Sequence, residues 1–241
     1  MANSQARDGR LGLAFIGGDP EVATSVAVGD FIVVTAKAAS SSDFEDYELN
    51  RPFFAMKAVA SLASGDEVYK IPLYFLGQAT GKSLSHSKNT TDVTMDYDEA
   101  TNNVTDGIVS TSGSISGMFI TERIVDDADT GVNILKSRFK TLVQIDKSGN
   151  VKTKDAATTE KDLFVFCWNL RNAKAGDLLD IDVVPALITG LSIGGEYGSS
   201  QSFDIDFSGN ASDENNFTGS ELQLEATEAL LAVFKTARPA V

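Results

Sequence analysis

The sequence has one cysteine, one histidine and one tryptophan among its 241 residues. The single cysteine, Cys167, cannot form an internal disulfide, so packing alone must hold the fold together. Its neighbours in LFVFCWNL are apolar, and we therefore expect Cys167 to be a small buried side chain. The single histidine, His86, leaves too few soft ligands for a zinc site. Any catalytic site in this chain would have to rely on carboxylates or hydroxyls.

Long apolar runs are also missing. No stretch reaches the roughly 18 apolar residues of a membrane-spanning helix, and the polar start MANSQARDGR lacks the apolar segment of a signal peptide. Apolar residues make up 42% of the chain and charged residues 22%, which is ordinary for a globular protein with a buried core. We expect a single domain over residues 1–241 with loosely ordered terminal arms.

Positive charge is scarce, since 20 Lys and Arg residues stand against 34 Asp and Glu residues, for a net charge of −14. A surface this acidic repels the phosphate backbone, which disfavours tight binding of nucleic acid. The charge can serve solubility alone, or it can let the protein lie close to nucleic acid without adhering to it. Composition does not choose between these two roles.

The stretch FLGQATGKSL, residues 75–84, resembles the start of a phosphate-binding loop. The spacing from Gly77 to Gly81 is one residue short of that loop, and the position that must be glycine is Leu76. The residues after Ser83 are also a poor helix start, although a bound phosphate needs a helix N-terminus beneath it. The sequence therefore predicts a glycine-bounded turn between two strands rather than a nucleotide site.

Carboxylates recur in pairs along the chain. Asp96 and Asp98 occupy two positions of a possible calcium loop, but the remaining ligands and the turn glycine are missing. Asp180 pairs with Asp182, and Asp204 with Asp206, each two residues apart. In a strand such residues point to the same face, which suits a glycosidase pair or, more commonly, the solvent-facing side of a sheet. No combination of residues calls for a cofactor or a metal.

Short runs of β-branched and aromatic residues, separated by glycine-containing turns, predict a mainly β fold: a sandwich or barrel of short antiparallel strands. Helical spacing of apolar residues predicts one flanking α-helix at about 130–142. Residues 50–65 suit a helix or a pair of strands, and 220–235 suit either a helix or a strand. Strands are expected at 178–184 and 186–193, on either side of Pro185.

Two stretches resemble the major tail tube proteins of tailed bacteriophages: SKNTTDVTMDYDEATNNVTDGIVSTSGSISG (87–117) and VVPALITGLSIGGEYGSSQSFDIDFSGN (183–210). The resemblance covers the middle and C-terminal two-thirds of the chain. It implies a structural virion protein, not an enzyme, whose β-sandwich subunits form rings, usually hexameric, that stack into the tube for DNA. Assembly would occur in the host bacterial cytoplasm, away from membranes. The implied partners are further copies of the chain and other tail proteins such as the tape measure, tail terminator and baseplate components.

DNA passing through a tube should not bind its wall, so an acidic lumen is expected. The lumen candidates are Asp180, Asp182, Asp204 and Asp206. The acidic loop Ser40–Asn50 and the two termini are the candidate contacts to the next ring. Within the loop, the candidate residues are Ser42, Asp43, Phe44, Glu45, Asp46 and Tyr47. Other classes remain open from the sequence, namely a head decoration or head–tail joining protein and, in a different class, a carbohydrate-binding module or enzyme.

Overall fold

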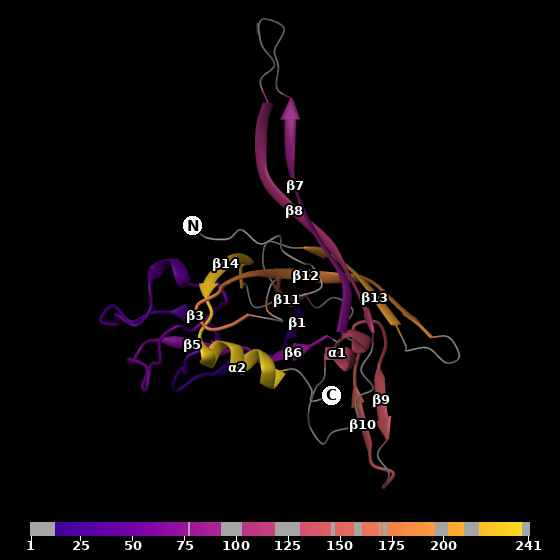
Figure 1. Cartoon of the computed structure of the whole chain (residues 1–241), viewed down its shortest axis with the longest axis horizontal. Helices are drawn as coiled ribbons and strands as arrows, with labels where there is room; N and C mark the ends of the chain where they lie inside the picture. Colours follow the sequence, from indigo (N-terminus) through magenta and orange to yellow (C-terminus); the bar gives the residue numbers. More distant parts are fainter. Residues whose placement is uncertain are drawn as a thin grey trace, which may run out of the picture.

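We describe the protein from a computed structural model, over residues 13–76, 78–92, 103–118, 131–145, 148–156, 161–168, 170, 173–195, 202–209 and 217–237. The terminal arms and the possible calcium loop at Asp96 and Asp98 lie outside these residues. Within them, the mainly β fold is confirmed, with antiparallel sheets and few helices (Figure 1).

The main sheet has eight strands in the order β6-β1-β11-β12-β13-β8-β7, and β14 also pairs with β12. Its strands are β1 (Leu13–Gly17), β6 (Leu73–Phe75), β7 (Gln78–Asp92), β8 (Asn103–Met118), β11 (Asp162–Cys167), β12 (Leu178–Gly194), β13 (Ser202–Gly209) and β14 (Ser220–Glu225). Strands β6 and β7 stand at opposite ends of this order, yet only two residues separate them along the chain. The sheet therefore curls, although these two strands do not pair and no closed barrel forms among the described strands.

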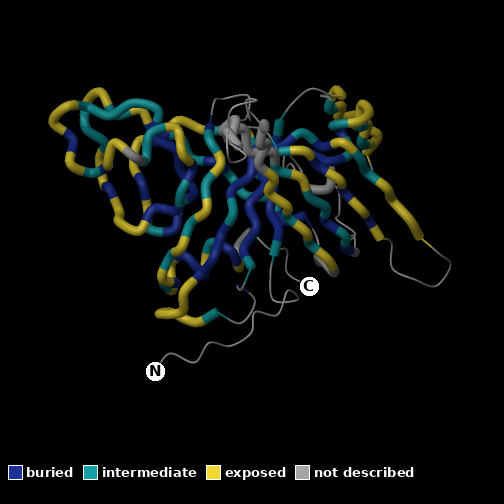
Figure 2. The backbone as a smooth tube through the Cα atoms, turned by 90° about the horizontal axis from the view of Figure 1, so that it is seen from above, coloured by how far each residue is buried: buried dark blue, intermediate teal, exposed yellow. Residues whose placement is uncertain are grey.

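A four-stranded sheet and two helices cover parts of the main sheet. The small sheet has the order β2-β5-β3-β4, with β2 (Glu21–Val22), β3 (Phe31–Ala36), β4 (Phe53–Phe54) and β5 (Glu67–Lys70). The helices are α1 (Gly131–Ser137) and α2 (Glu228–Ala237), and a 3-10 helix spans Asp46–Glu48. Strands β9 (Leu142–Ile145) and β10 (Val151–Lys154) form a separate two-stranded sheet. Figure 2 shows buried residues concentrated in the middle of the molecule.

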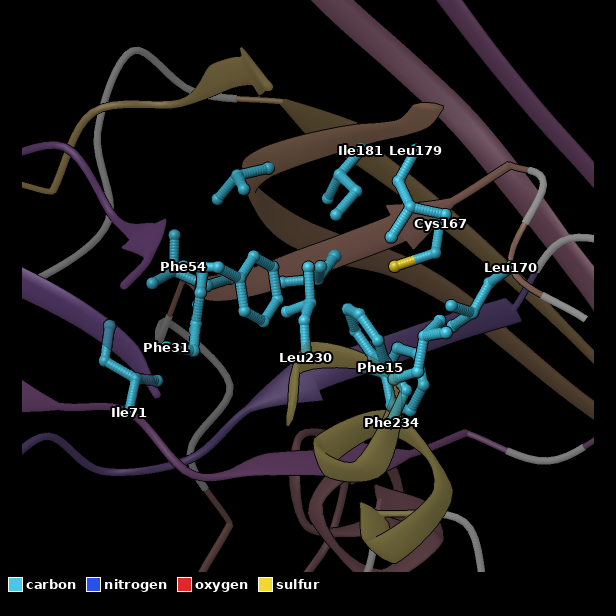
Figure 3. Close-up of a cluster of buried hydrophobic side chains, with 14 of the residues drawn as sticks. Phe15, Phe31, Phe54, Ile71, Cys167, Leu170, Leu179, Ile181, Leu230 and Phe234 are labelled. Atoms are coloured by element: carbon cyan, nitrogen blue, oxygen red, sulfur yellow. The ribbon is translucent and has the colours of Figure 1, made fainter. Parts of the chain in front are cut away.

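The first core lies between one face of the main sheet, the small sheet and α2 (Figure 3). Phenylalanine rings join its layers: the centroid of Phe234 on α2 lies 5.5 Å from that of Phe15 and 5.0 Å from that of Phe54. These spacings are typical of favourable aromatic pairs. Cys167 is buried in this cluster, as expected from its apolar neighbours.

The second core lies on the opposite face of the same sheet. Rings from β11 and β13, the strands on either side of β12, stack here, with the centroids of Phe164 and Phe207 5.1 Å apart. Helix α1 contributes Ile134 and Leu135. The side chains of successive residues on β11 enter the two cores alternately, which explains why all six residues of this strand are buried.

The helix predicted near 130–142 is present but shorter, because α1 ends at Ser137 and residue 142 already begins β9. The Ser137 hydroxyl donates a hydrogen bond to the carbonyl oxygen of Ile134 at 2.7 Å, a local bond that competes with continuation of the helix. The ambiguous segment 220–235 contains both elements, first β14 and then α2. Residues 50–65 contain no helix; they form β4 and turns.

Two predictions about strand breaks are wrong. The expected turn at residues 77–83 is replaced, from Gln78 onward, by the start of the 15-residue strand β7. The two strands expected around Pro185 are one strand, β12. Pro185 lacks an N–H to donate, but it lies where one edge of β12 changes partner, after β14 has paired up to Val183 and before β13 begins at Ala186. The proline therefore sits at a gap in the pairing along this edge.

Candidate functional surface

The C-terminal half of β12, together with β13, β8 and β7, exposes a polar surface on the face of the sheet that carries the first core elsewhere. Along β13, Phe203, Ile205 and Phe207 enter the second core, and the aspartates between them point to the opposite, solvent-facing side. Neither α2 nor the small sheet covers this part of the sheet, because Asp204 and Asp206 are both exposed.

Small hydroxyl side chains surround the two aspartates. The register places Asp204 opposite Ser116 and Asp206 opposite Ser114 on β8, and Ser192 of β12 opposite Asp204 on the other side. The next strand continues the surface, since Ser83 of β7 lies opposite Ser114 and the two hydroxyl oxygens are 2.8 Å apart. We call this set the serine–aspartate patch; it consists of Ser83, Ser114, Ser116, Ser192, Asp204 and Asp206.

Glycines keep the patch flat and its strands close. Gly190 lies opposite Asp206, where a Cβ atom would come within 3.1 Å of the carboxylate. Gly113 of β8 faces the second core, and a Cβ atom there would overlap the Ser83 carbonyl oxygen and the Phe207 ring. Gly113 therefore marks a close backbone approach within the sheet.

The patch carries negative charge without a neighbouring cation on the same face. Over residues 81–87, 112–117, 190–194 and 202–208, the alternation assigns no Lys or Arg to this face. The nearest cation in sequence, Lys82, lies on the opposite face, with its Nζ atom 5.0 Å from the centroid of the Trp168 ring. Burial lowers the pKa of Lys82 to about 8. A polyanion approaching the patch would therefore meet hydroxyls and carboxylates.

The other predicted lumen pair lies on the opposite face of the main sheet. Asp180 and Asp182 lie on the second-core face of β12, opposite to the face that carries Asp204 and Asp206. Asp180 is buried, and the carboxylate of Asp182 accepts a hydrogen bond from Nε1 of Trp168 at 2.5 Å. The four aspartates therefore do not share one surface, and the expectation that all four line a lumen needs correction.

The loop predicted to contact the next ring is held to the small sheet. Phe44 is buried in a third core with Ile32 and Val34, so its side chain is not available for contact. Asp43 forms an ion pair with Lys57 at 3.4 Å, and Asp46 forms one with Lys37 at 3.1 Å. Ser42, Glu45 and Asp46 are exposed, whereas the side chain of Tyr47 lies outside the described part of the structure. Only part of the loop therefore presents side chains to a partner.

The buried ion pair Arg138–Asp162 fixes the segment after α1 to β11. The Arg138 guanidinium donates to both carboxylate oxygens of Asp162, from Nε at 2.9 and 3.1 Å and from Nη2 at 2.6 Å. Both side chains are largely removed from solvent. Such a two-pronged geometry compensates the cost of burying the charges and orients α1 over the second core.

Other chemistry finds little support in the described residues. No group of three or more His, Cys, Asp or Glu side chains among them could hold a metal ion. His86 is exposed on β7, where its Nδ1 atom lies 3.0 Å from the hydroxyl oxygen of Thr111 on β8. Burial raises the pKa of the Cys167 thiol, which disfavours the reactive thiolate. None of the described helices is long and apolar enough to cross a membrane.

The serines of the patch were not among the residues predicted from sequence. Their signal is the alternation in STSGSISG, residues 110–117, where serine recurs at every second position. Such spacing places the hydroxyls on one face of a strand. Knowing that this face is solvent-exposed and adjoins Asp204 and Asp206 requires the pairing register.

Comparison with known proteins gives limited information. No protein-family model and no curated protein matches the chain. Among solved structures, the chain is similar to a protein in the tail of an empty gene transfer agent particle computed with C6 symmetry. The identity is 16%, the match covers 64% of this chain and 87% of the other, and the TM-score is 0.37. A protein in the virion of a native gene transfer agent particle is 17% identical over 62% and 88% of the two chains, with a TM-score of 0.34.

Proposed function

We propose that this chain is a structural subunit of a phage-type tail tube, and that the serine–aspartate patch lines the channel through which DNA passes. The observation that carries this proposal is the composition of the patch, which consists of four hydroxyls and two carboxylates, with no cation on its face. Carboxylates repel a phosphate backbone, and small side chains offer no aromatic surface on which bases could stack. A wall of this kind favours passage over binding.

The ribbon formed by β7 and β8 supports self-assembly. Strand β13 pairs with β8 only over residues 112–118, so β8 from 103 to 111 pairs only with β7 among the described strands. At about 3.4 Å per residue, the 15 residues of β7 span roughly 50 Å. Figure 1 shows this ribbon extending away from the body. A two-stranded ribbon is marginally stable in water, so contact with another subunit would stabilise it.

An open strand edge also supports self-assembly. No described strand pairs with the outer edge of β7. Unpaired backbone N–H and C=O groups recruit further strands, and closure into a ring removes such edges. In the proposed tube, edges of neighbouring subunits pair, the patches of all copies face the channel, and rings stack through other surfaces. The tape measure, tail terminator and baseplate proteins would be the further partners.

Negative-stain electron microscopy of the purified protein at high concentration tests the proposal. Hollow, regularly striated tubes or closed rings are the expected result. Small dispersed oligomers that bind to capsids would instead assign the protein to the head of a virion. Dispersed monomers that remain so after prolonged concentration and after addition of a phage lysate would refute the tube-forming role.

A further inference from the structure

The part of the main sheet that carries the serine–aspartate patch ends in two open strand edges. This part consists of β12, β13, β8 and β7, in that order. At one end, no described strand pairs with the outer edge of β7. At the other end, β11 pairs with β12 only as far as Ala186, so residues 187–194 pair with β13 alone among the described strands. Unpaired backbone groups therefore flank the patch on both sides.

The two open edges are equally long and lie at the same height in the sheet. The register can be followed strand by strand from β12 through β13 and β8 to β7. It places Gly194 level with Gln78, and Leu187 level with Ser85. The edge of β12 from Leu187 to Gly194 thus matches the edge of β7 from Gln78 to Ser85.

The strand directions also match. Each of the three neighbouring pairs in this part of the sheet is antiparallel. Because the number of strands is even, β12 and β7 run in opposite directions. A β7 strand placed beside the β12 strand of another copy is therefore antiparallel to it, and the alternating pattern continues unbroken from copy to copy.

The shape of each copy leaves room for the added strand. In the receiving copy, β11 occupies the edge of β12 from Ala186 onward, where Asp162 lies opposite. A foreign β7 strand along residues 187–194 must therefore leave the sheet after Ser85. It does so already in the free chain, since β13 pairs with β8 only as far as Ser112, the residue opposite Ser85. Beyond that point the ribbon extends away from the body (Figure 1).

An exposed apolar residue marks the open edge of β12. Ile193 lies opposite Phe203, which is buried in the second core, yet Ile193 itself is 41% exposed. Its neighbour on the same face, Leu191, is only partly buried against that core. A strand added at this edge would cover Ile193 and extend the second core across the contact between copies.

We propose that the outer edge of β7 in one copy pairs with residues 187–194 of β12 in the next copy, so that the patches of successive copies form one continuous surface. This inference rests on the proposed tube-forming function and names the two edges through which copies join. Because two different edges meet, each copy uses one edge of each kind. The contact is head to tail and ends only when the copies close into a ring.

Cross-linking of the double variant Ser83→Cys/Ser192→Cys tests this contact, because it places one thiol on each edge and on the same face. Within one chain the two strands are three strand spacings apart, about 14 Å, whereas across the proposed contact they are adjacent, about 5 Å apart. A bismaleimide whose span lies between these distances links copies but not the two thiols of one chain. The native Cys167 is buried, and burial raises its thiol pKa, so it does not compete for the reagent.

The matched control is Ser83→Cys/Val22→Cys, because Val22 is a strand residue that is 77% exposed and lies on β2, outside both edges. Assembled protein of the test variant should give a ladder of covalent oligomers on a denaturing gel, in several-fold excess over the control. The longest product of the ladder gives the number of copies in the ring. Equal yields from the two variants would overturn the proposal.

Ile193→Lys supplies a second readout, since the added strand would bury the new charge. In the Ser83→Cys/Ser192→Cys background it should lower the yield of the ladder several-fold, whereas Val22→Lys should leave the yield unchanged. Circular dichroism checks that both variants keep the fold. An undiminished ladder from folded Ile193→Lys protein would contradict the proposed edge.

Electron microscopy of the same samples separates this contact from the tube-forming role. Tubes without the ladder refute the pairing of these two edges and leave the tube-forming role intact. The ladder without tubes supports the pairing and refutes the tube. The absence of both refutes both.

Discussion

Replacing Asp204 and Asp206 by lysine tests the channel role of the serine–aspartate patch most directly. Both side chains are exposed, and each faces a serine of β8, so lysine can extend into solvent without steric conflict. Surface substitutions of this kind change the free energy of unfolding by about 0.5 kcal/mol or less. The fold should therefore persist, as measured by circular dichroism and urea unfolding.

The double variant changes the charge of the patch by four units per subunit. Each new phosphate contact to duplex DNA adds a slope of about −0.9 to the dependence of log affinity on log salt. Two lysine contacts per subunit therefore lose roughly tenfold in affinity between about 50 and 200 mM salt. Wild-type tubes should show no such affinity, because their patch carries only carboxylates and hydroxyls.

Nuclease protection locates the bound DNA. Tubes of the Asp204→Lys/Asp206→Lys variant, assembled with short duplex fragments, should retain DNA that added nuclease does not degrade. The control, Glu21→Lys/Glu225→Lys, makes the same change in charge at exposed residues of β2 and β14, away from the patch. Its DNA should be degraded. Complete degradation in both variants would place Asp204 and Asp206 on the outside of the tube and refute the reasoning.

Three further variants probe the framework around the patch. Asp162→Asn leaves the Arg138 guanidinium buried beside a neutral amide and should cost about 3 kcal/mol in urea unfolding, part of which Arg138→Met restores. Lys82→Met should stabilise the protein by about 1–2 kcal/mol at pH 7, a value discounted for partial exposure. The stability of the wild-type protein should rise between pH 8 and 10.5. In this range Lys82 keeps its proton in the unfolded chain but has lost it in the folded protein, where its pKa is lowered to about 8. The Lys82→Met variant should not show this rise. Gly113→Ala should cost about 1–3 kcal/mol by thermal unfolding, whereas Gly81→Ala, whose added Cβ would lie 3.8 Å from the nearest atom, should be tolerated.

The strands were predictable where one periodicity dominated. Ser202–Gly209 alternates strictly between buried and exposed residues, as its sequence indicates. The sequence of residues 220–235 fits both a strand and a helix because the segment contains β14 followed by most of α2. The glycines near residue 80 led to the wrong prediction of a turn, because glycine occurs both in turns and at close contacts between strands. Which of these applies depends on β8, whose partner residues lie about thirty positions away along the chain.

The functional surface depended on information that no local pattern contains. Each aspartate pair was correctly placed on one face of its strand, yet the two pairs point to opposite sides of the sheet. The cause is the register between the two strands: Ile188 lies opposite Phe207, so the even-numbered residues of this part of β12 share a face with the odd-numbered residues of β13. Such a register follows from the pairing of β12 with β13 rather than from the residues beside each aspartate. Sequence alone could thus supply candidate acidic residues, but not the surface to which each belongs.

The distribution of charge fits a protein that stays dispersed until its surfaces meet in the right orientation. A net charge of −14 makes free copies repel one another at distances comparable to the Debye length, about 8 Å at physiological ionic strength. Random encounters between copies are therefore repulsive, and only an orientation that pairs complementary surfaces, such as two open strand edges, overcomes the repulsion. The same negative charge that would keep DNA from adhering to the patch would thus also select the geometry in which subunits join.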